Sequence, residues 1–218
     1  MLLDIRKYTN IIWDWNGTLL NDVSICIKSI NILLKHRNLE LLTETKYREV
    51  FTFPVRKYYE HIGFDFSAED FTIPAHEFIT NYNNYFTEAK LFTDAVEVLD
   101  YFSKNNYRQF ILSAMEQDSL VKSVKDRDII DYFDTIIGID NHFATSKIDS
   151  GYKLIETMKL DKSKTVMIGD TLHDVEVADA MSIDCILVSR GHQSYDVLKT
   201  NGNIVKTSLI DIIACRIM

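Results

Sequence analysis

Residues 11–20 read IIWDWNGTLL, and the fold can be worked out from this stretch. The run at residues 11–13 is apolar and ends at Asp14, and the dipeptide Asn16-Gly17 that follows is typical of a turn. The stretch therefore predicts a buried strand that stops in a tight turn, with a carboxylate at its carboxyl end.

Beyond residue 90, short apolar runs alternate with helical patterns. We predict strands over residues 109–113, 135–139, 165–168 and 185–188, an edge strand over 203–206, and helices over 96–102, 118–125, 152–158 and 175–181. Val/Ile-rich runs between helices are typical of a parallel sheet that is covered on both faces. We therefore expect an α/β fold.

The segment between the first strand and residue 90 has a different pattern. Apolar residues recur at helical spacing from Val23 to Leu34, aromatic residues are frequent, and Pro54 and Pro74 are expected to mark helix boundaries. We predict a core of residues 1–18 and 90–218 with an inserted helical cap at 19–89. Such an insertion would cover the carboxyl edge of the sheet, where open α/β sheets bind ligands.

Composition narrows the class of protein. The 218 residues suffice for one domain with a sizeable insertion, and only 7 Gly and 2 Pro exclude collagen-like and linker-like chains. A net charge of -8 argues against nucleic-acid binding, and three cysteines without CxxC spacing argue against a disulfide framework or a zinc site. No apolar run is long enough to span a membrane, and charges interrupt the N-terminal segment where a signal peptide would be apolar. We expect a cytoplasmic protein.

Polar side chains follow four of the predicted strands: Asp14, Ser113, Lys147, and Asp170 with Asp174. One aspartate at a strand end is often only a helix cap, but consecutive βα loops converge on one edge of a parallel sheet. Paired carboxylates there would repel each other unless a hard cation such as Mg²⁺ joined them. With a lysine and a hydroxyl, the set could hold a phosphoryl group.

These motifs resemble those of the haloacid dehalogenase superfamily. IIWDWNGTLL resembles its first motif, LSA at 112–114 its second, Lys147 its third, and IGDTLHD at 168–174 its fourth, while LFTDAVEVLDYF at 91–102 resembles the entry to its second core half. The layout is most similar to that of phosphoglycolate phosphatases and β-phosphoglucomutases. The resemblance implies a Rossmann-like core with the central strand order 3-2-1-4-5 and a helical cap.

The resemblance also implies a role for each motif residue. Asp14 would be the nucleophile and a Mg²⁺ ligand, the Asn16 backbone carbonyl a second ligand, and Asp170 and Asp174 further ligands. Ser113 and Lys147 would hold phosphate, assisted by the loop at Gly17 and Thr18. The implied activity is Mg²⁺-dependent hydrolysis of a small phosphorylated metabolite through an aspartyl-phosphate. We expect a monomer or a homodimer.

Asn16 departs from the family pattern, because the phosphatases carry an aspartate there that protonates the leaving oxygen. An amide cannot exchange a proton near neutral pH. We therefore predict slow turnover, or substrates whose leaving group needs little protonation, such as acyl phosphates and phosphoanhydrides. The alternative is a catalytically weak relative that binds a phosphometabolite as a sensor or partner protein. A dehalogenase activity is less favoured, since the metal motif that dehalogenases lack is intact here. Deamidation of Asn16, which would produce the missing aspartate, is also less favoured.

Several neighbouring residues have competing interpretations. Ser113 could instead cap the following helix, and Lys153 could replace Lys147, although its helical setting predicts exposure. We expect His173 to be a surface residue rather than a ligand. His192 could line the rim of the site, but a loop role is favoured. Arg56 and Lys57 could meet an anionic substrate tail, but a solvated helix face is favoured. Trp13 is expected in the sheet core, and Trp15 is a candidate wall of the active site.

Overall fold

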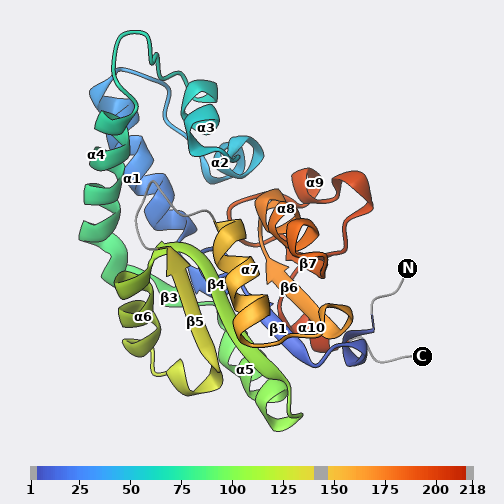
Figure 1. Ribbon diagram of the computed structural model, residues 1–218. Coiled ribbons are helices and arrows are strands. Elements are labelled where there is room, and N and C mark those ends of the chain that lie inside the picture. The colour runs from blue at the N-terminus through green and yellow to red at the C-terminus, as the bar shows by residue number, and fades with distance from the viewer. Residues whose placement is uncertain (1–3, 140–146, 215–218) are drawn as a thin grey trace.

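The computed structural model describes residues 4–139 and 147–214, and a six-stranded sheet is its central element (Figure 1). The sheet has the order β5-β4-β1-β6-β7-β8, and every neighbouring pair is parallel. Its strands are β1 (Asn10–Trp13), β4 (Arg108–Glu116), β5 (Thr135–Ile139), β6 (Thr165–Gly169), β7 (Asp184–Val188) and β8 (Val205–Lys206). The expected α/β class and the central strand order are confirmed, and β8 is the expected edge strand.

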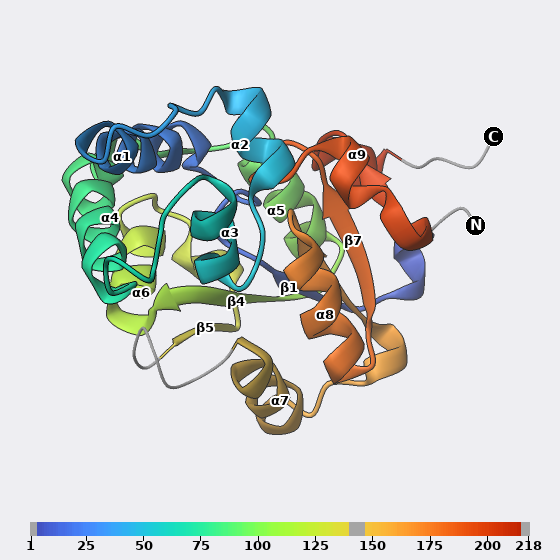
Figure 2. The same ribbon diagram turned by 90° about the horizontal axis from the view of Figure 1, so that it is seen from above.

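The central position of β1 explains why residues 11–13 are all apolar and do not alternate with polar residues. Ile11, Ile12 and Trp13 are fully buried. Ile12 belongs to the core under α7 (Lys147–Thr157) and α8 (Leu172–Met181). Ile11 and Trp13 belong to the core on the opposite face, under α5 (Ala95–Lys104) and α6 (Gln117–Lys125). Successive side chains of a strand point to opposite faces, so a strand covered on both sides needs apolar residues at every position (Figure 2).

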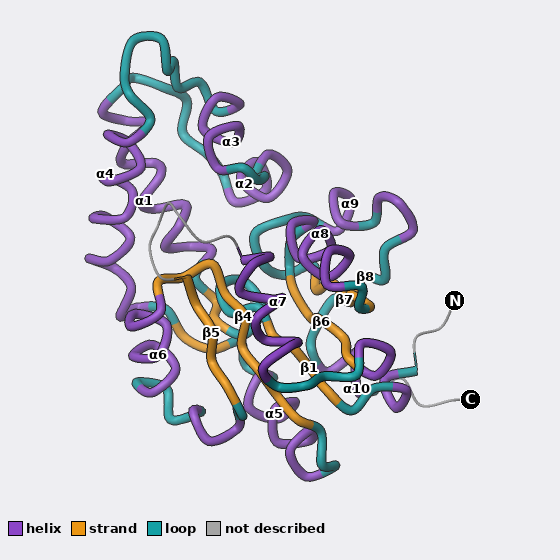
Figure 3. The backbone as a smooth tube through the Cα atoms, in the orientation of Figure 1, coloured by secondary structure: helices purple, strands orange, loops and turns teal. Residues whose placement is uncertain are grey.

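A helical segment stands over the carboxyl ends of the strands (Figures 1 and 3). The chain enters it through β2 (Leu20–Asn21) and leaves through β3 (Lys90–Leu91), and these two short strands pair antiparallel. The segment consists of α1 (Val23–His36), α2 (Glu44–Val50), α3 (Val55–His61), α4 (Thr72–Tyr85) and η2 (Phe86–Glu88). Pro54 directly precedes α3 and Pro74 lies in the first turn of α4, so both expected boundaries are confirmed.

Helix α7 begins earlier than the sequence pattern predicted. It starts at Lys147 rather than near residue 152, so Lys147 is the first residue of a helix and not part of a loop. Gly151 hid this start, because glycine disfavours a helix interior. A Cβ at position 151 would lie 2.6 Å from the Met181 sulfur of α8, and the glycine is therefore explained by close helix packing. Lys153 is exposed, as expected.

Short elements complete the described chain: η1 (Ile5–Lys7), η3 (Ile130–Tyr132), η4 (Lys162–Lys164), α9 (Tyr195–Leu198), η5 (Thr200–Gly202) and α10 (Ile210–Ile213). Cys26 and Cys185 are free thiols, and Cys215 lies outside the described residues. Within the described part of the chain, every helix is too short or too polar to cross a membrane.

Candidate active site

Two aspartates meet where β1 and β6 end. Asp14 directly follows β1 and Asp170 directly follows β6, and these strands are parallel neighbours with Trp13 opposite Ile168. Asp174 lies in the first turn of α8. One carboxylate oxygen from each of the three lies within 4.8 Å of the others, and all three side chains are buried. The predicted convergence of the strand ends therefore brings Asp14, Asp170 and Asp174 together.

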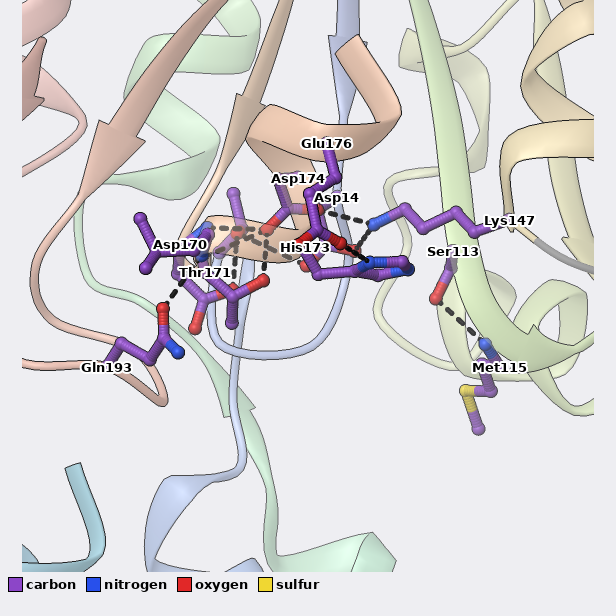
Figure 4. A network of polar contacts seen from close by, with 12 residues as sticks. Asp14, Ser113, Met115, Lys147, Asp170, Thr171, His173, Asp174, Glu176 and Gln193 are labelled. Carbon is purple, nitrogen blue, oxygen red and sulfur yellow. Dashed lines mark hydrogen bonds and ion pairs between the residues drawn. The ribbon is translucent and has the colours of Figure 1, made fainter. Parts of the chain in front are cut away.

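Lys147 reaches this group from the start of α7 (Figure 4). Its Nζ lies 2.5 Å from Asp14 Oδ1 and 2.6 Å from Asp174 Oδ1, and the lysine is buried. The second Asp174 oxygen accepts hydrogen bonds from the Thr171 backbone N–H and hydroxyl, at 3.0 and 2.8 Å. Asp174 thus completes a capping box at the start of α8 while it orients Lys147.

The charges of this group do not balance, because one ammonium faces three carboxylates. Burial raises the pKa of Asp14 to about 6, with a further contribution from Asp174 and opposition from Lys147. Burial and repulsion from Asp14 and Asp174 raise the pKa of Asp170 to about 8, although His192 opposes the rise. Although burial opposes it, the interaction with Lys147 lowers the pKa of Asp174. A bound cation would relieve this repulsion.

The loop after β1 packs tightly around Asp170. Gly17 has φ 76°, and a Cβ on either Gly17 or Gly191 would collide with the Asp170 carboxylate. The Thr18 hydroxyl lies 3.3 Å from Asp14 Oδ2 and 3.2 Å from Asp170 Oδ1, so it can donate to either. Only glycine permits this approach and this backbone conformation, which explains the turn expected at Asn16-Gly17.

Ser113 lies beside the group, where β4 departs from regular pairing. The register with β5 runs to Leu112 and then shifts, so that Glu116 is the next paired residue. Ser113 Oγ accepts a 3.1 Å hydrogen bond from the Met115 N–H, which leaves its own hydroxyl proton free to donate (Figure 4). The alternative role of Ser113 as a helix cap is wrong, because Glu116 accepts from the first backbone N–H groups of α6.

The Asn16 side chain is directed toward the helical segment. Its Nδ2 donates to Asp22 Oδ2 and to the Tyr82 hydroxyl, both at 2.9 Å. Tyr82 in turn donates to Asp22 Oδ2 at 2.7 Å. The Asp22 carboxylate can only accept from these partners, so Asn16 must present its NH₂ group to them.

His192 has a different place from the one expected. It is buried, its Nε2 lies 3.3 Å from Asp22 Oδ1, and its Nδ1 lies 2.9 Å from the Tyr47 hydroxyl. Although burial alone would lower it, the interaction with Asp22 raises the pKa of His192 to about 9. The expected loop role is wrong because the segment after β7 folds inward under the helical segment. No motif marked Asp22 and Tyr47, which meet His192 only through tertiary packing, or Tyr82, which donates to Asp22.

Of the other aromatic and charged residues considered in the sequence, Trp15 lies elsewhere than predicted. Trp15 is not a wall of the site: it is fully buried and its Nε1 donates to Ser123 Oγ at 3.2 Å. Trp13 lies in the sheet core, as expected. Arg56 and Lys57 are exposed, as expected for a solvated helix face. His173 is partly exposed, pairs with Glu176 at 2.9 Å and lies on the rim of a cavity between the carboxylates and the helical segment.

A cavity of about 280 Å³ connects the carboxylates with the helical segment. Its polar end includes Asp14, Ser113, Lys147 and Asp170. The other end is aromatic, with these side chains from α2, α3, α4 and the loop between α2 and α3: Tyr47, Phe51, Phe53, Tyr58, Phe78 and Tyr82. The geometry places an acidic end that contains one lysine next to an aromatic chamber.

The fold and the site define an α/β enzyme with an acidic centre at the carboxyl edge of a parallel sheet. The chain belongs to the family of haloacid dehalogenase-like hydrolases, whose model matches residues 11–188. This assignment confirms the resemblance seen in the sequence motifs.

Individual relatives are distant. The chain is 22% identical to the pyrophosphatase PpaX of Listeria welshimeri and 25% identical to PpaX of Listeria monocytogenes, in each case over 78% of both chains. A predicted phosphatase from Clostridium acetobutylicum has a similar solved structure, with a TM-score of 0.74 at 21% identity over 94% of this chain and 96% of that chain. This structural likeness concerns the fold.

Proposed function

We propose that this hydrolase is a phosphatase that cleaves a small phosphorylated metabolite through an aspartyl-phosphate on Asp14. The observation that carries the proposal is the pairing of Asp14 with Lys147, at 2.5 Å, at the acidic end of the cavity. A carboxylate nucleophile beside a fixed ammonium is suited to attack on a phosphoryl group, whose transfer depends mainly on positioning and charge stabilisation. The names of the relatives, a pyrophosphatase and a phosphatase, agree with this reaction class.

Mg²⁺ fits the donor set. The three carboxylates offer only oxygen ligands, and their charge exceeds that of Lys147, which is the condition under which a hard divalent cation binds. In the proposal Asp14, Asp170 and the Asn16 backbone carbonyl hold the ion, with Asp174 as a direct or water-mediated ligand. When bound, Mg²⁺ would neutralise negative charge on the phosphoryl oxygens.

The chain's own residues then supply the nucleophile and the groups that bind the phosphoryl oxygens. An Asp14 oxygen forms a bond to phosphorus while the bond to the leaving oxygen breaks. A water molecule next attacks phosphorus, which restores the carboxylate and releases inorganic phosphate. Lys147 and the free Ser113 hydroxyl proton would bind the phosphoryl oxygens, and the loop at Gly17 and Thr18 would hold the aspartates in place.

Asn16 limits the proton transfers. Its amide is engaged by Asp22 and Tyr82 and has no proton to give to a leaving oxygen. General acid–base catalysis typically contributes about 10²–10⁴-fold. We therefore propose slow turnover of alkyl phosphates and preference for substrates whose leaving group departs as a stable anion.

We further propose that residues 19–89 act as a cap on a core of residues 1–18 and 90–218. The paired strands β2 and β3 form a narrow connection between the two parts, and helices α1–α4 face the strand ends. Closure of such a cap over a bound substrate would exclude bulk water from the reacting phosphorus.

The test is release of inorganic phosphate from pyrophosphate, acetyl phosphate, phosphoglycolate and glycerol 3-phosphate, with Mg²⁺ and with excess chelator. We expect Mg²⁺-dependent release from at least one substrate and loss of release in the Asp14→Asn variant, which keeps the size of the side chain. Phosphate release that is unchanged in Asp14→Asn would contradict the proposal.

A second candidate function is phosphometabolite sensing without efficient catalysis. The engaged amide of Asn16 favours it, because the residue that would serve as the acid is absent. In that case the wild-type protein would bind a phosphorylated ligand in the presence of Mg²⁺ but would release no phosphate above the Asp14→Asn blank.

A further inference from the structure

The aromatic end of the cavity forms a continuous surface over the acidic end. The Phe51 ring centroid lies 5.3 Å from that of Tyr47, 5.2 Å from that of Tyr58 and 5.5 Å from that of Phe53. The Phe53 ring stacks on His173, with centroids 4.6 Å apart, at the rim beside Asp174. Phe51, Phe53 and Phe78 are only partly buried and line the cavity, so ring surface remains accessible to a ligand.

The charged side chains of the cavity suit a ligand with one anionic group only. Among the described residues that line it, Lys147 is the only lysine or arginine, and it is bound by Asp14 and Asp174. His192 is paired with Asp22, and His173 with Glu176. A second anionic group, such as the carboxylate of phosphoglycolate, would enter the aromatic end without a charged partner, at a high desolvation cost.

The chemistry of the leaving group also restricts the class of substrate. Asn16 cannot protonate a leaving oxygen, and Asp22, the carboxylate nearest to it, already accepts hydrogen bonds from Asn16, Tyr82 and the Gly17 N–H. A phenol has a pKa of about 10, against about 16 for water, so a phenolate leaves without general-acid help far more readily than an alkoxide does.

We propose that this cavity takes the phosphate monoester of a small phenol, with its single ring against Phe51 and Phe78 and its phosphate beside Lys147. The inference rests on the proposed phosphatase function and specifies its substrate class. In the reaction the bond from phosphorus to the aryl oxygen breaks, and the oxygen leaves with the electron pair as phenolate and takes a proton from water. Asp14 receives the phosphoryl group, and hydrolysis then yields phenol and inorganic phosphate.

Four substrates separate the two features on which the inference depends. Phenyl phosphate has a ring and a good leaving group, benzyl phosphate has a ring only, acetyl phosphate has a good leaving group only, and glycerol 3-phosphate has neither. We expect kcat for phenyl phosphate to exceed that for benzyl phosphate by about 10²–10⁴-fold, the usual contribution of the acid that is missing. We expect KM for phenyl phosphate to be about 10-fold or more below that for acetyl phosphate, because the ring is buried on binding.

Phe51→Leu and Phe78→Leu test the aromatic end directly. Each should raise KM for phenyl and benzyl phosphate about 3- to 10-fold while KM for acetyl phosphate stays unchanged, since only the ring substrates contact these positions. Tyr195→Leu is the matched control, because Tyr195 is an exposed aromatic residue of α9 outside the cavity. It should leave all four substrates unchanged.

Three results would overturn the inference. These are a kcat/KM for acetyl phosphate or glycerol 3-phosphate that equals that for phenyl phosphate, an equal rise in KM for all four substrates in the phenylalanine variants, and turnover of a phosphotyrosyl peptide as efficient as that of phenyl phosphate. Efficient turnover of the peptide would indicate that the substrate is a phosphorylated protein rather than a free one-ring molecule.

Binding of phosphonates separates this inference from the phosphatase proposal itself. If no substrate releases phosphate but phenylphosphonate binds at least about 10-fold more tightly than methylphosphonate, the phosphatase function is wrong and the aromatic subsite is supported. If there is neither turnover nor preference for phenylphosphonate, both are wrong.

Discussion

Two buried groups of possible metal ligands lie side by side in this protein and differ in charge balance. The acidic floor consists of Asp14, Asp170 and Asp174 with Lys147, and the linking cluster consists of Asp22, Cys26 and His192. In both groups the potential ligand atoms lie within 4.8 Å of one another. The floor has three carboxylates for one ammonium, whereas the linking cluster has one carboxylate for one imidazole.

The linking cluster is satisfied by its own partners. Asp22 accepts hydrogen bonds from Asn16, Gly17 and Tyr82, and it lies opposite His192. Although burial opposes it, the charge of His192 lowers the pKa of Asp22. Ligand spacing alone therefore does not define a metal site. We expect a cation to bind at the floor, where uncompensated charge remains, and the linking cluster to join α1 to the core.

Asn16 lies between the acidic floor and the linking cluster. Its substitution is expected to have the largest effect, which is on kcat. In Asn16→Asp the new carboxyl group would face Asp22, and repulsion would keep it protonated near neutral pH, as a general acid requires. We expect kcat for glycerol 3-phosphate to rise about 10²–10⁴-fold, with a smaller gain for phenyl phosphate. Asn16→Ala, which removes the amide without adding an acid, should give no gain. If Asn16→Asp is no faster on any phosphoester, the interpretation of Asn16 as a missing acid is wrong.

Removal of the single cation from each group tests the charge comparison. Lys147→Met keeps the length of the side chain but leaves Asp14 and Asp174 without their cation, so the metal-free protein should lose about 3–5 kcal/mol of unfolding free energy. His192→Gln can still hydrogen-bond to Asp22 and should lose only about 1–3 kcal/mol. Urea unfolding at pH 7.5 measures both losses.

Mg²⁺ is expected to affect the stability of these two variants differently, so that each variant is a control for the other. It should recover part of the loss in Lys147→Met, because the ion can replace the missing positive charge at the floor. It should stabilise His192→Gln only as much as wild type. Equal rescue of both variants would show that the two groups do not differ as the charge count indicates.

Metal-induced stabilisation locates the cation. At about 100 times its Kd, Mg²⁺ should stabilise the wild-type protein by about 2.7 kcal/mol, which corresponds to a rise in Tm of about 5–10 °C for a chain of this size. Asp170→Asn should lose most of this rise, while Cys26→Ser in the linking cluster should keep it. If Cys26→Ser lost the rise in Tm and Asp170→Asn kept it, the ion would bind at the linking cluster, and the assignment of the cation to the acidic floor would be wrong.

The sequence predicted the acidic floor but not the linking cluster. Strand ends can be recognised from local sequence patterns, whereas contacts between distant segments cannot. Asp14 and Asp170 follow apolar runs, and parallel strands carry the residues after them to one edge. His192 and Tyr47 are 145 residues apart and come together only through packing of the helical segment on the core. Trp15 was misplaced because an aromatic residue beside Asp14 suggests a wall, whereas its ring lies in the core against Ser123.

The last and smallest expected effect is the pH dependence of stability. The folded pKa of Asp170, about 8, and that of Asp14, about 6, exceed their usual value of 3.8, so both groups favour folding at low pH and lose this contribution as pH rises through these values. The pKa of His192, about 9, exceeds its usual 6.5, so its contribution is complete below pH 6.5 and is lost as pH rises through 9. All three therefore make the metal-free protein less stable as pH rises.

Saturating Mg²⁺ separates the floor from the linking cluster in this pH profile. Because the ion binds the ionised carboxylates, it should remove the part of the fall due to Asp14 and Asp170 and leave that of His192. We expect a residual loss of about 2 kcal/mol between pH 7 and 9 in wild type, measured by urea unfolding, and a flat profile over the same range in His192→Gln. A residual loss that persists in His192→Gln would mean that the linking cluster does not hold a charged imidazole, and the one-to-one charge balance of that cluster would be wrong.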